Sequence, residues 1–271
     1  MTVVVIILSV LAVLATLFLF LICPARRRHP DRQLLEGAHI AHRGLHSQSP
    51  NTPENSLAAF RLAAEQGFPI EMDIHLTADG EVVVFHDDDL RRMCNAQGTP
   101  ETLTLEQLKT YRLNGTEESI PTLRECLDVV AGRVPLLIEF KCSFSNCGQL
   151  CAAADGILRS YTGGYVIQSF YPPVLHWYRR HHPEVCRGQL SSAFRGESLV
   201  KQLLGCLVFN VLGRPDFISY DHRYAGHPAF RLNTRLGALP VCWTFTSQED
   251  IDSCATRCRT YIFEQFMPIH K

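Results

Sequence analysis

Short apolar runs alternate with helix-compatible segments along most of this 271-residue chain, and this alternation constrains the fold more than any other feature. The runs that we interpret as strands are 39–43, 70–76, 135–141, 165–170, 186–191, 216–221, 240–245 and 260–264. The helix-compatible segments are 56–66, 104–112, 121–131, 147–160, 172–182, 197–207, 227–236 and 247–255. Strands that are separated by helices predict a parallel sheet. Eight of them in about 235 residues predict an α/β fold, an irregular β/α (TIM-type) barrel.

An open, doubly wound sheet is the alternative to a closed barrel. No glycine-rich GxGxxG turn follows the first strand, and this absence argues against the open sheet. Hydroxyl side chains at Ser56, Thr104 and Ser247 stand where three of the helices begin, and we expect them to cap these helices or to lie in their first turns.

One further run, VVVFHD at 82–87, does not fit the alternation. Only TADGE separates it from the strand at 70–76, which is too short for a parallel crossover. Asp79-Gly80 is a strong tight-turn signal, so we expect an antiparallel β-hairpin inserted at one rim of the barrel. Counting back from a turn centred on Asp79 and Gly80 places Asp73 opposite His86.

The amino terminus predicts a membrane anchor. Residues 2–22 carry no charge, and about 20 apolar residues span the hydrocarbon layer. The segment lacks the basic start and the small-residue cleavage site of a signal peptide. We therefore expect a single transmembrane helix within 1–23, a basic juxtamembrane linker at 24–36 and one barrel domain at 37–271.

Basic residues on one side of the apolar segment predict its orientation in the cell membrane. Four arginines follow the segment and no Lys or Arg precedes it: Arg26, Arg27, Arg28 and Arg32. Because cytoplasmic flanks carry the excess of Lys and Arg, we expect the barrel domain to lie in the cytoplasm.

Cysteine content and net charge narrow the class of protein further. The eleven cysteines lack the paired spacing of a zinc site, so we interpret them as buried free thiols in a reducing compartment. A net charge of −1 excludes a strongly basic nucleic-acid surface. No segment of the sequence indicates a protein partner.

Acidic side chains gather where predicted strands end. Glu71 and Asp73 are two residues apart on one strand, so their side chains project to the same face, and Glu139 and Lys141 repeat this spacing on another. A solvated strand face would also explain such a pair, but parallel strands are covered on both sides. The carboxyl ends of barrel strands form the active face. Three carboxylates there predict a hard divalent ion, Mg²⁺ or Ca²⁺.

Two histidines and two cations complete the predicted site. His42 follows the first strand and His86 lies in the predicted hairpin, and histidine serves as acid or base near neutral pH. Arg43 offers a fork that matches phosphate oxygens, and Lys141 offers a point charge. This combination predicts chemistry on a phosphodiester.

The segments AHRG…PENS, EMDIHLTADGEVVVFHD and IEFK, with the later QSF and CWTF, closely resemble the glycerophosphodiester phosphodiesterase family. The resemblance implies a barrel with a hairpin and hydrolysis of glycerophosphodiesters to glycerol 3-phosphate and an alcohol. It implies the following roles: metal ligands Glu71, Asp73 and Glu139; acid–base residues His42 and His86; phosphate contacts Arg43 and Lys141; a substrate-pocket wall at Trp243; and a supporting motif residue, Asn55, which we group with the substrate-binding residues.

Alternatives to this activity come from other classes of protein. A lysophospholipase D-type enzyme would take lysophospholipids, and a phospholipase C-like enzyme would need an inositol pocket. A membrane-anchored binding protein would hold a phosphate or a phospholipid without turnover. The YIFEQF segment at 261–266 departs from the Asp-Pro ending common in the family. We expect this departure to touch the last strand rather than the chemistry.

Overall fold

The computed structural model describes residues 2–46 and 51–269, and in these ranges the strands form one nine-stranded sheet that closes into a barrel. Residue 1 of the predicted anchor and residues 47–50 and 270–271 of the predicted domain lie outside the described residues. The strands are β1 (His39–Ala41), β2 (Ile70–Leu76), β3 (Val82–Val84), β4 (Leu136–Phe140), β5 (Tyr165–Ser169), β6 (Arg187–Ser191), β7 (Phe217–Asp221), β8 (Leu239–Phe245) and β9 (Thr260–Phe263).

Parallel pairing runs around the barrel in the order β1-β9-β8-β7-β6-β5-β4-β2. The pairing of β1 with β2 closes the ring. The closed TIM-type barrel is thus confirmed, and the open sheet is excluded. Each strand begins and ends within three residues of its predicted bounds, because the apolar runs that we interpreted as strands are the parts that both barrel faces bury.

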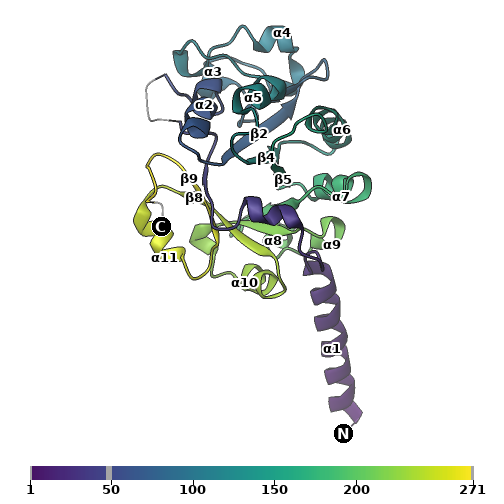
Figure 1. The fold of residues 1–271 in the computed structure, drawn as a ribbon. Helices are drawn as coiled ribbons and strands as arrows, with labels where there is room; N and C mark the ends of the chain where they lie inside the picture. Colours follow the sequence, from purple (N-terminus) through teal and green to yellow (C-terminus); the bar gives the residue numbers. More distant parts are fainter. Residues whose placement is uncertain (1, 47–50, 270–271) are drawn as a thin grey trace.

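Helices surround the strands in Figure 1. The α-helices of the described part are α1 (Thr2–Ile22), α2 (Leu57–Glu65), α3 (Arg91–Cys94), α4 (Leu105–Leu108), α5 (Leu123–Val130), α6 (Cys147–Leu158), α7 (Pro172–His181), α8 (Leu199–Gly205), α9 (Asn210–Gly213), α10 (Pro228–Arg235) and α11 (Gln248–Cys254). The caps predicted at Ser56, Thr104 and Ser247 are confirmed, since each side chain accepts a hydrogen bond from a backbone N–H of its helix. The predicted helix 104–112 is only one turn long, in α4.

The β2–β3 hairpin is confirmed, but its predicted register is wrong by one residue. Ile74 pairs with Val84, and the N–H of Phe85 donates to the carbonyl of Asp73 at 2.9 Å, so Phe85 and not His86 lies opposite Asp73. The turn is centred on Asp79 alone, because the Thr77 N–H donates to the Glu81 carbonyl and the loop spans residues 78–80. A three-residue loop shifts the register relative to a two-residue turn.

The predicted linker contacts the barrel over much of its length. Within it lies a 3₁₀-helix, η1 (Pro30–Leu34), which is the short purple helix that crosses the ring of strands after α1 in Figure 1. Leu35 is buried in an apolar cluster with Ile40, Phe217 and other residues from the strands. Arg32 donates a 2.9 Å hydrogen bond to the carbonyl of Gly237. These contacts fix the chain between α1 and the first strand.

The helix α1 projects from the body (Figure 1), and its residues are exposed except near its C-terminal end. Its 21 residues have a mean hydropathy of 3.2 over the most apolar window, as expected for a membrane span. Ile22 is buried, and α1 contacts α9. One helix of this kind suits either a membrane anchor or a signal sequence.

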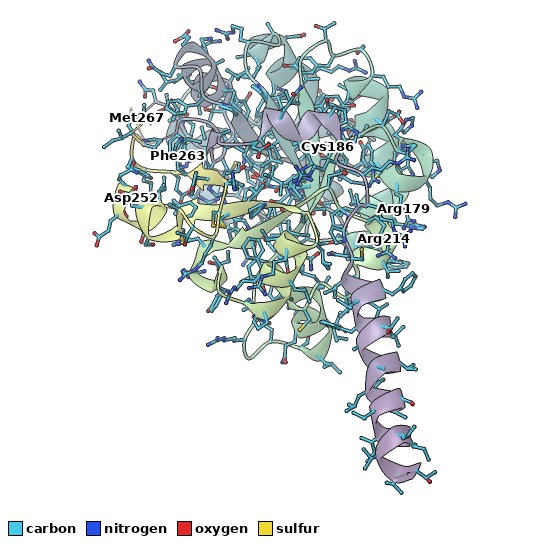
Figure 2. The ribbon with its side chains drawn as sticks, turned by 60° about the horizontal axis from the view of Figure 1, so that its bottom comes forward. Arg179, Cys186, Arg214, Asp252, Phe263 and Met267 are labelled. Carbon is cyan, nitrogen blue, oxygen red and sulfur yellow. A yellow bond between two sulfur atoms is a disulfide. The ribbon has the colours of Figure 1, made fainter. Side chains whose placement is uncertain are left out.

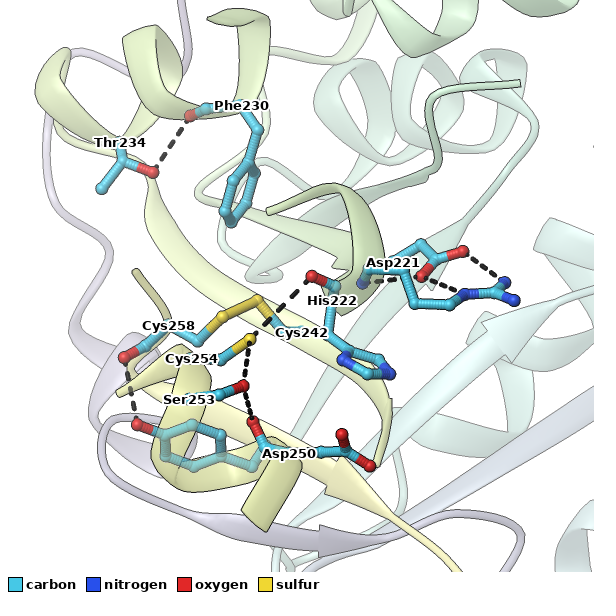
Figure 3. Close-up of a disulfide and its surroundings, with 11 residues drawn as sticks. Asp221, His222, Phe230, Thr234, Cys242, Asp250, Ser253, Cys254 and Cys258 are labelled. Atoms are coloured by element: carbon cyan, nitrogen blue, oxygen red, sulfur yellow. Dashed lines mark hydrogen bonds and ion pairs between the residues drawn. A yellow bond between two sulfur atoms is a disulfide. The ribbon is translucent and has the colours of Figure 1, made fainter. Parts of the chain in front are cut away.

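The interpretation of every cysteine as a free thiol is wrong. Cys242 on β8 and Cys258, just before β9, form a disulfide, with their Cα atoms 6.0 Å apart (Figure 3). All eleven cysteines lie in the described residues, and the remaining nine are free. Because β8 and β9 are neighbouring barrel strands, Cys242 within β8 and Cys258 just before β9 can meet although 16 residues separate them. The disulfide removes the cysteine argument for a reducing compartment.

Candidate functional site

The carboxyl ends of the strands bring the predicted site residues together. In the barrel register Asp73 pairs with Glu139, and Glu139 pairs in turn with Gln168. A pocket of about 100 Å³ opens at this end of the barrel. Its lining includes most of the predicted site residues: His42, Arg43, Glu71, His86, Glu139, Lys141 and Trp243.

Three buried carboxylates form the centre of the site. Each of Glu71, Asp73 and Glu139 offers an oxygen, and these oxygens lie within 4.8 Å of one another. Burial, followed by repulsion from Asp73 and Glu139, raises the pKa of Glu71 well above its usual value. Burial also raises the pKa of Glu139. The three acidic groups are therefore costly to ionise together unless a cation lies among them.

Two cationic side chains partly compensate this charge. Lys141 Nζ lies 2.6 Å from Glu139 Oε1 and 3.1 Å from Asp73 Oδ1. Arg43 Nε lies 3.7 Å from Asp73 Oδ2, and the Arg43 backbone N–H donates to Glu71 Oε2 at 3.1 Å. Although burial opposes it, Lys141, His86 and Arg43 together lower the pKa of Asp73. Asp73 therefore carries the most stable negative charge of the three.

The donor set fits a hard divalent ion. All three groups supply carboxylate oxygens, which Mg²⁺ and Ca²⁺ prefer and which suit zinc less well. Asp73 Oδ1 is buried, and apart from its ion pair with Lys141 it has no hydrogen-bond partner among the described residues, so it retains a lone pair for a ligand. An ion there would also remove the repulsion that raises the pKa of Glu71 and Glu139.

His42 is oriented by a carboxylate from the far end of the chain. Its Nδ1 lies 2.7 Å from Oε2 of Glu264, which directly follows β9, and its Nε2 lies 4.0 Å from Glu71 Oε2. A carboxylate at Nδ1 favours the proton on that nitrogen and leaves Nε2 available to the pocket. Burial lowers the pKa of His42, and the hydrogen bond to Glu264 partly opposes this shift.

His86 has an equivalent carboxylate partner in its neighbour. Its Nδ1 lies 2.7 Å from Asp87 Oδ1, and burial lowers the pKa of His86. Arg92 donates to both Asp87 and Glu54, and Arg43 also donates to Glu54 at 2.7 Å. Because guanidinium groups occupy these acids, Glu54 and Asp87 hold side chains in place rather than offering free oxygens to an ion.

Asn55 lies behind the carboxylates and not on the pocket wall. Its Nδ2 donates to Asp73 Oδ2 at 2.9 Å, and the Asp73 N–H donates to Asn55 Oδ1 at 3.4 Å. Asn55 adopts the left-handed conformation with φ of 55°, which asparagine tolerates better than most residues. Its position is that of a residue that orients Asp73.

Aromatic and polar side chains complete the lining of the pocket. The Trp243 ring packs edge-on against Phe170, with ring centroids 5.7 Å apart. Trp243 Nε1 and Gln168 Oε1 are buried and have no hydrogen-bond partner among the described residues, which leaves one donor and one acceptor for a polar ligand. A groove of about 710 Å³ shares Lys141 and Phe170 with the pocket and continues past Tyr171.

Sequence reasoning missed several residues that support the site. Glu264 follows the C-terminal end of a barrel strand, the same position that identified His42, so this signal was available. The expectation that the departure at 261–266 touches only the last strand is wrong, because Glu264 contacts His42 directly. Asp87 stands next to His86 in the sequence, whereas the bridge from Arg92 to Glu54 joins segments that no spacing rule connects.

The sequence profile of the Glycerophosphoryl diester phosphodiesterase family matches residues 42–255, which are most of the chain. The chain belongs to this family. The Glycerophosphodiester phosphodiesterase of Caldanaerobacter subterraneus subsp. tengcongensis is 40% identical over 110 residues, 38% of this chain and 44% of that protein. Rat Lysophospholipase D GDPD1 is 31% identical over 141 residues, 47% of this chain and 44% of that protein. The chain spans about half the length of the curated relatives it matches.

A solved structure shows the same fold over a longer part of the chain than the sequence matches cover. A phosphodiesterase of Oleispira antarctica, in complex with the product sn-glycerol-3-phosphate, aligns with a TM-score of 0.72 and 25% identity. The alignment covers 86% of this chain and 94% of that chain. The likeness therefore includes nearly the whole barrel.

Proposed function

We propose that this protein hydrolyses glycerophosphodiesters to glycerol 3-phosphate and an alcohol, with a divalent metal ion as cofactor. The observation that carries the proposal is the close approach of the Glu71, Asp73 and Glu139 carboxylates in a pocket that also contains two histidines. Family membership and the glycerol 3-phosphate bound to the Oleispira relative support the same substrate class.

The chain's own residues supply binding and proton transfer. Arg43 and Lys141 line the pocket and would contact the phosphate oxygens, which match a guanidinium fork and an ammonium point charge. A bound Mg²⁺ or Ca²⁺ would supply further charge stabilisation to the phosphate. Of His42 and His86, one accepts the proton of the attacking hydroxyl and the other protonates the leaving alcohol. Their carboxylate partners at Nδ1 keep both Nε2 atoms available for this exchange.

Glycerophosphocholine with and without a chelator tests the activity most directly. We expect chelator-sensitive release of glycerol 3-phosphate and choline, and a fall in turnover of about 10²–10⁴-fold in His42→Ala or His86→Ala. His176→Ala, on the outer surface of α7, is the control and should keep full activity. Release of phosphocholine would instead mean cleavage on the other side of phosphorus and would contradict the proposal.

Lysophospholipids are a second candidate substrate class, favoured by the groove beside the pocket. This groove of about 710 Å³ has Phe140, Tyr171 and Leu204 in its lining, and Phe144 stands nearby with 86% of its surface exposed, its ring 6.3 Å from that of Tyr171. An acyl chain would remove this apolar surface from water. Phe144→Ser should then slow hydrolysis of lysophosphatidylcholine and leave glycerophosphocholine hydrolysis unchanged. Equal effects on both substrates would contradict an acyl-chain groove.

We further propose that α1 is retained as a membrane anchor. Side chains of the body bind the backbone carbonyls at its C-terminal end: Asn210 donates to Ile22 at 3.0 Å, and Arg214 donates to Phe20 and Cys23 at 2.8 Å. These bonds satisfy carbonyls that a helix end leaves unpaired. A segment removed by a peptidase would have no need of such partners in the body.

The mass of the protein purified from membranes tests this proposal. The intact chain should be recovered from detergent extracts with Thr2–Ile22 still attached, and high salt should not release it from membranes. A mature form that begins after Ile22 would identify α1 as a signal sequence instead.

A further inference from the structure

A groove beside the end of α1 gathers positive charge at the expected depth of the lipid headgroups. It has a volume of about 770 Å³, and we call it the arginine groove. Its lining includes two apolar residues of α1 and four arginines from three separate segments: Leu19, Phe20, Arg26, Arg27, Arg179 and Arg214. Figure 2 shows Arg179 of α7 and Arg214, which follows α9, where α1 meets the body.

These arginines lack acidic partners. No acidic side chain of the described residues lines the arginine groove, and none of the ion pairs among the described residues involves its arginines. Burial and the nearby charges of Arg179 and Arg26 lower the pKa of Arg214, as expected where like charges are confined together. Such a cluster of fixed cations attracts an anion.

The depth of the arginine groove determines which anion can reach it. The 21 residues of α1 extend about 31 Å, which matches the hydrocarbon thickness of about 30 Å, so the bilayer surface lies near the C-terminal end of α1. Thr16 and Leu19 line the end of the groove nearest the membrane, and Arg26 and Arg27 follow the end of the helix. A phospholipid fits both ends of the arginine groove, because its acyl chains can lie along α1 while its phosphate lies among the arginines.

We propose that the arginine groove binds one anionic phospholipid of the surrounding bilayer. The site is separate from the barrel pocket and does not depend on the hydrolytic activity, but it does rest on the retention of α1. Two arginines are already positioned by backbone carbonyls: Arg179 Nη1 donates to Val211 and Leu212, and Arg214 Nη1 donates to Phe20 and Cys23. Fixed guanidinium groups lose little freedom when they bind a phosphate.

Arg179 allows a test with a matched control. It lies on α7, far in sequence from the arginines that follow α1, so its replacement leaves the flank of the membrane segment intact. Arg133 also donates to carbonyls at a helix end, those of Val129 and Val130, and it follows α5, a helix that lies away from α1 (Figure 1). Arg179→Gln and Arg133→Gln therefore remove the same charge and the same kind of backbone contact.

The experiment uses the full chain in nanodiscs of phosphatidylcholine with one tenth phosphatidylglycerol, released into native mass spectrometry. We expect one retained phosphatidylglycerol on the wild type and on Arg133→Gln, about fivefold weaker retention in Arg179→Gln, and none in a variant that also carries Arg26→Gln and Arg27→Gln. Equal retention of phosphatidylcholine, or equal losses in Arg179→Gln and Arg133→Gln, would overturn the proposal.

Further measurements distinguish the lipid site from a free-phosphate site, from loss of α1 and from misfolding. Millimolar inorganic phosphate should not displace the lipid, and displacement would identify a free-phosphate site instead of a lipid site. The intact mass, read in the same spectrum, reports whether α1 is present, so loss of the anchor is recognised independently of lipid binding. Glycerophosphocholine hydrolysis by Arg179→Gln should equal that of the wild type, which excludes general misfolding.

Discussion

Glu264 Oε2 lies 2.7 Å from Nδ1 of His42, although 222 residues separate them in the chain. The contact forms because β9 and β1 are neighbours in the barrel, with Phe263 paired to Ala41, so the residues that follow both strands share one corner of the site. His86 has Asp87 at the same ring nitrogen and the same distance. Both histidines thus have a carboxylate at Nδ1, which leaves Nε2 of each ring for the pocket that they line.

Replacing Glu264 should change the pH profile of the reaction. The hydrogen bond and charge of Glu264 raise the pKa of His42, against burial, which lowers it. Glu264→Gln removes the hydrogen bond and charge that raise this pKa, so the pKa of His42 should fall further. The part of the kcat/KM profile that follows the titration of His42 should then move to lower pH. We also expect kcat to fall on the order of tenfold, with a smaller change in KM.

A carboxylate far from the site is the control for Glu264→Gln. Glu65→Gln, at the exposed end of α2, should leave both limbs of the profile in place. An unchanged profile in Glu264→Gln would mean that this contact does not orient His42 or tune its pKa.

Metal binding should stabilise the fold in a pH-dependent manner. At a free ion concentration 100 times the dissociation constant, Mg²⁺ or Ca²⁺ should raise the free energy of unfolding by about 2.7 kcal/mol, measured as a rise in Tm. Burial raises the pKa of both Glu71 and Glu139, so protons compete with the ion. The rise in Tm should therefore be smaller at pH 5 than at pH 7.5.

Glu71→Gln tests whether the three carboxylates cause the metal-dependent rise in Tm. This variant removes one carboxylate and should lose most of the metal-dependent rise in Tm, whereas Glu65→Gln should retain it. A full rise in Glu71→Gln would place the ion elsewhere in the chain.

The fold was largely predictable because local patterns encode it. Each apolar run at 136–140 or 217–221 is buried on both faces, and only a parallel strand between two layers requires that composition. The grouping of Glu71, Asp73 and Glu139 was predictable for the same reason, since these three acids interrupt otherwise apolar strands.

Features that depend on closure of the ring were harder to predict. The contact of Glu264 with His42 requires β9 to lie beside β1, which only the closed ring provides. The disulfide of Cys242 with Cys258 requires instead the register of β8 and β9, which the sequence does not state. The prediction of the hairpin register was wrong for a local reason. Thr77 Oγ1 accepts from the Glu81 N–H, and this bond closes a three-residue loop where the Asp79-Gly80 signal favoured a two-residue turn.

Packing inside the barrel predicts opposite effects for two glycines. Gly188 on β6 pairs with Phe217 on β7, and a Cβ at Gly188 would lie 2.0 Å from the Phe217 ring. Gly188→Ala should therefore lower the free energy of unfolding by about 1–3 kcal/mol. Gly156 in α6 is exposed, and a Cβ there meets nothing within 4 Å, so Gly156→Ala should raise stability by about 0.5–1 kcal/mol. Thermal unfolding of both variants in detergent checks the pair, and a Gly188→Ala protein as stable as the wild type would contradict the packing around Phe217.

The Cys242–Cys258 pair reports the side of the membrane on which the barrel lies. The arginines after α1 favour the cytoplasm, where thiols are kept reduced, whereas the disulfide needs oxidising conditions. If the barrel faces the cytoplasm, cells lysed directly into denaturant and an alkylating agent should give eleven modified cysteines. The purified protein, after oxidation in air, should give nine, because the two thiols meet in the fold.

Cys242→Ser is the control for this count, since it should give ten modified cysteines under both conditions. Reduction of the purified wild type should also lower its stability by about 3 kcal/mol, the value expected for a closed loop of this length. Nine modified cysteines in freshly lysed cells would place the barrel in an oxidising compartment. The orientation predicted from the arginines would then be wrong, and the headgroups at the arginine groove would belong to the outer leaflet of that membrane.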